Sequence, residues 1–155
     1  MPSSTLSLSR ESRRIAGLLL LSIIAVEFGG YYLTRVASGK ENLTDFQEAF
    51  SRAGHAHAGV LVALSLIIVV LADAADLHGP IGYVGRLGVP AAAILMPTGF
   101  FLSSRTAGAT EPNGWVVLLW LGAISLTVGV VTVGVALLRG SIAGSAAGGL
   151  HHVGG

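Results

Sequence analysis

The chain has 155 residues, of which 52% are hydrophobic and only 11% are charged. Soluble domains carry about 25% charged residues, so this composition excludes an ordinary water-soluble protein and indicates a membrane protein. The net charge of +1 argues against a general nucleic-acid-binding surface. Because the sequence contains no cysteine, disulfides, thiolate nucleophiles and cysteine-ligated metal centres are excluded.

Four segments are apolar over a length that can cross a bilayer, which takes about 20 residues in a helix. They are Ile15–Val36, Ala53–Ala72, Leu87–Ser103 and Trp115–Leu138. The sequence therefore predicts an all-α fold, a bundle of four transmembrane helices over residues 15–139 in contact with the lipid bilayer. Residues 1–14 are predicted to form an N-terminal tail. The Gly-, Ala- and Ser-rich residues 140–155 are predicted to form a flexible C-terminal tail.

Polar residues between the spans predict a helix start and an orientation. Thr44 and Gln47 have the spacing of a capping box, so the second helix is expected to begin near Asp45, before its span. Four spans place both termini on one side of the membrane. The basic residues on that side are Arg10, Arg13, Arg14, Arg86 and Arg139, against Arg35, Lys40, Arg52 and Arg105 on the other. The bias predicts a multi-pass protein of the cell membrane with both termini in the cytoplasm.

Two histidines lie at the start of the second span, in the stretch RAGHAHAG. Residues two apart on a helix point about 200° away from each other, so a single metal ion does not easily bind both His55 and His57. Small residues, Gly59 among them, leave room beside the His57 imidazole for a flat macrocycle or another backbone. One axial histidine suffices to hold haem iron. The alternative is that the histidines bond a carbonyl or a headgroup, and that the small residues only pack helices.

Glu27 is an ionisable residue thirteen residues into the first span. A charge at that depth is costly and usually faces the protein interior or a cavity. Glu27 is therefore expected to pair with His55, His57 or Arg52, or to stay protonated. The alternative is that it extends to the membrane interface beside two neighbouring tyrosines.

The third span contains Pro97 and Gly99, which weaken a helix and predict a kink. The kink is expected to open a substrate pocket walled by Met96, Phe100 and Phe101, with Met96 as a second candidate iron ligand. Ordinary core packing is the alternative for these three residues. The polar residues outside the spans are interpreted as solvated loops or tails: Asp73, Asp76, His78, Arg105, Glu111, Asn113, His151 and His152.

The sequence AHAG, from Ala56 to Gly59, resembles a motif of a family of small four-helix membrane proteins. That family includes styrene oxide isomerase and, more distantly, hydroxylaminobenzene mutase. Chain length, span number and the place of the motif in the second helix agree with it. The stretch RAGHAHAG also resembles a widespread type of actinobacterial membrane protein. The family's arginine two positions before the motif histidine is His55 here, and its asparagine six positions after is Ala63.

The resemblance implies a homotrimer that binds haem b in the membrane between subunits, with His57 as the iron ligand. It also implies an isomerase that converts a small apolar epoxide to a carbonyl compound, with the iron as a Lewis acid. His55 and Glu27 would then support the ligand, and the residues that act in catalysis stay unknown. The missing asparagine bears on the isomerase reaction more than on haem binding, because that asparagine positions the substrate.

Two functions of other classes stay open from the residues alone. One is a non-catalytic accessory or assembly subunit of a larger membrane complex, in which His55, His57 and Glu27 fix the register of the helices. The other is a small proton or ion conduit through the same residues. The conduit is less favoured because four spans offer few polar groups to line a pore.

Overall fold

The computed structural model describes residues 7–150, with side chains described for residues 7–142. Within this range the chain forms four long helices and one 3₁₀ turn, η1, and contains no strand. The elements are α1 (Arg10–Ala37), α2 (Asp45–Ala74), α3 (Gly79–Ser103), η1 (Gly114–Val116) and α4 (Val117–Leu150). Each of the four helices is long and apolar enough to cross a membrane, which confirms the predicted all-α, four-helix architecture.

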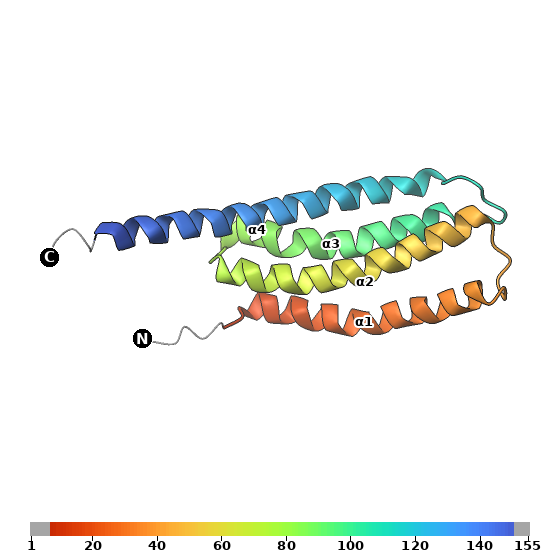
Figure 1. Ribbon diagram of the computed structural model, residues 1–155, viewed down its shortest axis with the longest axis horizontal. Helices are drawn as coiled ribbons and strands as arrows, with labels where there is room; N and C mark the ends of the chain where they lie inside the picture. The colour runs from red at the N-terminus through yellow and green to blue at the C-terminus, as the bar shows by residue number, and fades with distance from the viewer. Residues whose placement is uncertain (1–6, 151–155) are drawn as a thin grey trace.

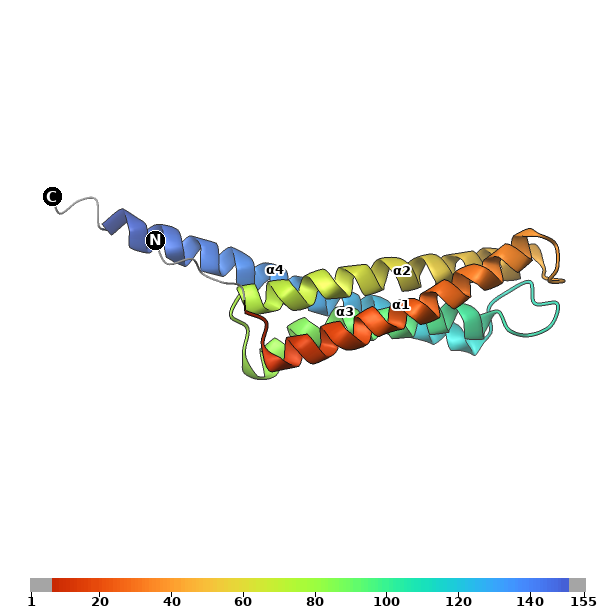
Figure 2. The same cartoon turned by 90° about the horizontal axis from the view of Figure 1, so that it is seen from below.

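The helices pack mostly with their neighbours in sequence. α2 packs against α1 and α3, and α3 packs against α4, whereas α1 touches little besides α2. The start of α1, the α2–α3 turn and the end of α4 lie at one end of the molecule, the terminal end, and the other two loops lie at the opposite end (Figure 1). α4 extends beyond the bundle at the terminal end (Figure 2). The sparse contacts of α1 leave a gap in the packing between α1 and α3.

The observed helix ends agree with the sequence at one position and differ at three. The Thr44 hydroxyl accepts a hydrogen bond from the Gln47 backbone N–H, and the Gln47 side-chain oxygen accepts one from the Thr44 backbone N–H. The predicted capping box is therefore confirmed. α1 begins at Arg10, so residues 10–14 are helical where an N-terminal tail is predicted. α3 begins at Gly79 rather than Leu87. α4 continues to Leu150, so residues 140–150 have helical backbone where a flexible tail is predicted. Residues 1–6 and 151–155, the latter with His151 and His152, lie outside the described part of the chain.

Glycines bring α3 and α4 together. A Cβ atom added to Gly88 would lie only 2.6 Å from the Cα of Gly129, so the two backbones touch here. The Ser125 hydroxyl donates a hydrogen bond of 2.8 Å to the Gly88 carbonyl. Since lipid offers no hydrophobic driving force between helices, such close contact and interhelical hydrogen bonding stabilise this pair.

A buried ion pair joins three helices near the terminal end. The Arg86 guanidinium of α3 lies 2.6 Å from the Asp73 carboxylate of α2, and their side chains are only 5% and 7% exposed. Asp73 also accepts from the Ser9 backbone N–H at 2.8 Å, and Arg86 donates to the Ser12 hydroxyl at 3.1 Å. Asp73 therefore belongs to the last turn of α2 and to the core, which corrects its interpretation as a solvated loop residue.

The α3–α4 loop is anchored on the start of α2 at the opposite end. The buried Gln47 amide donates to the carbonyls of Ser104 and Thr106, at 2.9 and 3.0 Å. The Thr44 hydroxyl donates to the Ala109 carbonyl, and the Asn113 amide donates to the Leu102 carbonyl at 3.0 Å. This loop is thus bonded to the bundle, and Asn113 is part of its anchor.

Candidate functional site

The two histidines lie on opposite flanks of the contact between α2 and α3. Gly54 is buried at this contact, where an added Cβ would lie 3.0 Å from the Phe100 Cβ and 3.1 Å from the Phe101 ring. His57 packs against Phe100 on one flank. His55 shares the other flank with Phe101. This arrangement follows from the helical periodicity, because residues 55 and 57 point about 200° away from each other. The narrow contact between the two helices is occupied by Gly54, which has no side chain.

The hydrogen bond of His57 fixes its tautomer. Nδ1 lies 2.8 Å from the Ala53 carbonyl oxygen, one helical turn earlier. Because a carbonyl only accepts, Nδ1 must carry the proton and donate it. In the neutral imidazole Nε2 then carries the lone pair, and no side chain or backbone group in the described range bonds to it. This is the tautomer in which a histidine binds a metal through Nε2 while its other nitrogen is held by a carbonyl.

Successive contacts between aromatic rings connect the start of α2 to His57. The rings of Phe46 and Phe50 are 4.2 Å apart, and Phe50 meets Phe100 edge-on at 5.3 Å. The Phe100 ring lies 4.9 Å from the His57 ring at an interplanar angle of 39°. The imidazole is therefore half-buried in apolar surroundings on this flank.

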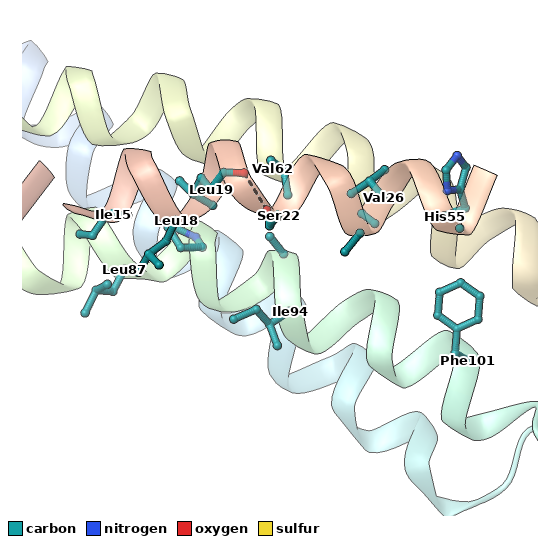
Figure 3. A pocket seen from close by; sticks show the side chains of 15 residues that line it. Ile15, Leu18, Leu19, Ser22, Val26, His55, Val62, Leu87, Ile94 and Phe101 are labelled. Carbon is teal, nitrogen blue, oxygen red and sulfur yellow. Dashed lines mark hydrogen bonds between the residues drawn. The ribbon is translucent and has the colours of Figure 1, made fainter. Parts of the chain in front are cut away.

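The other flank opens into a groove between α1, α2 and α3, with a volume of about 400 Å³. We call it the α1–α3 groove. His55 and Phe101 lie at one end, and Ile15 and Leu87 lie at the other (Figure 3). The remaining lining side chains are almost all aliphatic. The exception is Ser22, whose hydroxyl donates to the Leu19 carbonyl at 2.7 Å.

His55 reaches into this groove because α1 has two glycines beside it. A Cβ atom on Gly29 would lie 3.1 Å from the His55 Nδ1, and one on Gly30 would lie 3.4 Å from its Cε1. Neither ring nitrogen of His55 forms a hydrogen bond within the described residues. The adjacent glycines Gly29 and Gly30 within the first predicted span are a sequence signal for this close approach, which the prediction of a site at the histidines missed.

Within the single chain, the other predicted cofactor-binding residues lie away from the His57 ring. Glu27 is exposed on the outer face of α1 and contacts neither histidine. The expected Glu27–Arg52 pair does not form either, because Arg52 pairs with Glu48 on its own helix. Gly59 lies toward α1, where a Cβ atom added to it would lie 3.9 Å from Val26 Cγ1.

The three residues predicted to wall one pocket lie in different places. Of the three residues only Phe101 lines the α1–α3 groove, while Phe100 lies on the His57 flank. Met96 packs against α4 at Gly122, where it fills the space that a side chain would need. The reason is geometric: residues 96 and 101 are about 140° apart around a helix and therefore face different neighbours.

The donor set limits which metal group this chain can hold. Among the side chains that the structure describes, no three His, Asp or Glu residues come close enough to form a metal site. A macrocycle that supplies its own nitrogen ligands needs only one axial histidine. Comparison with protein families, with curated proteins and with solved structures finds no match to this chain.

Proposed function

We propose that this protein is an integral membrane protein that binds haem b, with Nε2 of His57 as the axial ligand. The observation that carries the proposal is the 2.8 Å hydrogen bond from His57 Nδ1 to the Ala53 carbonyl. It orients the ring and leaves Nε2 as the ligating atom. The neighbouring Phe100 ring and the small side chains of Ala53 and Ala56 provide apolar, uncrowded surroundings for a macrocycle.

The chemistry proposed for the site is isomerisation of a small apolar molecule, of the epoxide-to-carbonyl type. Bound haem would supply a Lewis-acidic iron with one open coordination position. The chain itself would contribute the oriented imidazole and a site that excludes bulk water. Because His55, Gly59 and Glu27 lie away from His57, ligation is assigned to His57 alone. A homotrimer in the cell membrane, with cytoplasmic termini, remains part of the proposal.

The test is the absorption spectrum of the protein purified in detergent after growth with haem supplementation. We expect a Soret band that is lost in His57→Gly and regained when free imidazole is added, since the small ligand can fill the vacated position. His55→Ala is the matched control, because it removes an imidazole two residues away and should keep the band. A wild-type protein without a Soret band would refute haem binding, and loss of the band only in His55→Ala would refute the assigned ligand.

A second function, a non-catalytic subunit of a larger membrane complex, is favoured by Glu27. Its carboxyl group lies on the outer face of an apolar helix, where contact with lipid is costly. A partner helix with a hydrogen-bond donor would relieve this cost. Co-purification of a stoichiometric partner from mild detergent, abolished by Glu27→Leu and retained by Phe28→Leu, would support this function. A protein that purifies alone and carries haem would contradict it.

A further inference from the structure

We propose that the α1–α3 groove is a binding site for an uncharged, lipophilic molecule that carries one hydrogen-bonding oxygen, which His55 holds. The ligand class is that of a long-chain alcohol or ketone that enters from the bilayer. The site lies on the opposite flank of α2 from His57. The proposal therefore does not depend on haem binding, and the two can fail separately.

The lining of the groove excludes a charged ligand. Among the described residues no Lys, Arg, Asp or Glu lines it, and the aliphatic side chains from Ile15 to Val26 form most of one wall. A charged group in such surroundings would lose its hydration without gaining a partner. The volume of about 400 Å³ lies in the range of small-molecule sites, which extends from about 300 to 1,000 Å³.

Among the described residues that line the groove, His55 is the side chain with both a donor and an acceptor unused, because the Ser22 hydroxyl keeps acceptor capacity alone. The Ser22 hydroxyl donates its proton to the Leu19 carbonyl, whereas the His55 nitrogens have no partner in the described chain. A neutral imidazole has one donor and one acceptor, so it can bond a hydroxyl or a carbonyl oxygen. Within apolar surroundings such a nitrogen is costly when unpaired, and a ligand oxygen would remove that cost.

The shape of the groove sets the orientation of the ligand. Its lining on α1 extends from Ile15 to Gly29, a rise of about 20 Å at 1.5 Å per residue. His55 and Phe101 stand at one end of this length, and only aliphatic groups stand at the other (Figure 3). A molecule with its oxygen at one end of a hydrocarbon chain therefore matches the groove in one direction only.

The experiment uses the full chain in nanodiscs and a long-chain alcohol with a photoreactive diazirine in its hydrocarbon part. After irradiation, mass spectrometry should find the label on groove-facing peptides of α1 and α3, and little on the exposed face of α4. Excess dodecanol should compete about fivefold better than dodecane, as expected for one hydrogen bond of about 1 kcal/mol. Label spread evenly over all lipid-facing helices would overturn the proposal.

Three variants separate the parts of the proposal. His55→Phe keeps a ring in place but removes the hydrogen bond, so labelling should persist while the advantage of dodecanol over dodecane disappears. Ala25→Leu should fill the groove and abolish labelling, whereas Ala63→Leu, on the exposed face of α2, should leave it unchanged. Equal preference for the alcohol in wild type and His55→Phe would refute the role of His55. A second copy of the chain could instead cover the groove. The variant Ala25→Cys would then form disulfide-linked dimers and the groove would not be labelled, which would refute a lipophilic ligand.

Discussion

At the scale of single residues, the ion pair between Asp73 and Arg86 gives the sharpest stability prediction. Both side chains are almost fully buried, so removing one leaves a charge without its partner. Asp73→Ala should lower the free energy of unfolding by about 3–5 kcal/mol. The measurement is thermal unfolding in detergent, followed by circular dichroism.

Two controls distinguish the buried charge from a general effect of the substitution. Glu111→Ala removes an exposed loop carboxylate and should leave the unfolding temperature nearly unchanged. The double variant Asp73→Leu with Arg86→Met should regain most of the lost stability, because it removes both charges together. Equal stability of Asp73→Ala and wild type would show that the pair contributes little.

The same residues show where sequence reasoning stops. Asp73 stands beside a turn, and the nearest apolar window ends at Ala72, so hydropathy places it in solvent. Its partner Arg86 lies thirteen positions away, across a turn that reverses the chain. The pairing depends on how α2 and α3 align after that turn, and no local pattern encodes this alignment. By contrast, the separation of His55 and His57 follows from helical geometry alone.

At the scale of helices, the contact between α3 and α4 predicts a strong dependence on one glycine. Gly88→Ala would place a methyl group 2.6 Å from the Gly129 Cα, so the helices would have to move apart. Overpacking of this kind costs about 1–3 kcal/mol of stability. Gly134→Ala is the matched control on α4, since nothing lies within 4 Å of its added Cβ. It should be neutral or slightly stabilising, because alanine is the better helix former. The free energies of unfolding of the two variants and of the wild type are measured side by side for this comparison.

The anchored α3–α4 loop gives a prediction about local dynamics. Gln47→Ala removes both hydrogen bonds to the Ser104 and Thr106 carbonyls. The backbone amides of residues 104–110 should then exchange with deuterium faster, while those in the middle of α3 should not change. Glu48→Ala is the control at the next position. Its side chain pairs with Arg52 and has no bond to the loop. Unchanged loop exchange in Gln47→Ala would mean that other contacts hold the loop.

The helix boundaries show what hydropathy detects and what it misses. The four spans could be predicted because each contains an uninterrupted apolar stretch of the required length. The start of α3 at Gly79 could not, because residues 79–86 include three glycines, a proline and an arginine. The arginine is neutralised within the bundle, and Pro80 fits the first turn of a helix. Similarly, α4 continues past Arg139 because backbone hydrogen bonding does not end where the apolar stretch ends.

At the scale of the whole molecule, the α1–α3 groove follows from the unequal packing of the helices. α3 is held on both sides, by α2 and α4, whereas α1 packs mainly on α2. Between α1 and α3 the aliphatic side chains therefore face a hollow rather than each other. The sequence predicted a pocket near Phe101, but it could not predict its walls, because they come from three helices whose rotation is set by packing.

The arrangement of the loops makes a topology prediction that the lack of cysteine allows to be tested directly. The α1–α2 and α3–α4 loops lie at one end of the molecule, and the start of α1 and the end of α4 lie with the α2–α3 turn at the other (Figure 1). Single cysteines introduced as Lys40→Cys and Thr110→Cys should react with a membrane-impermeant maleimide on intact cells. Ser7→Cys and His78→Cys should react only after permeabilisation, because the arginines before the first span favour cytoplasmic termini. The opposite pattern for all four would reverse the orientation and keep the fold. Labelling of Ser7→Cys and His78→Cys from different sides would contradict the four-span architecture, since α1 and α2 together must return the chain to the side on which it began.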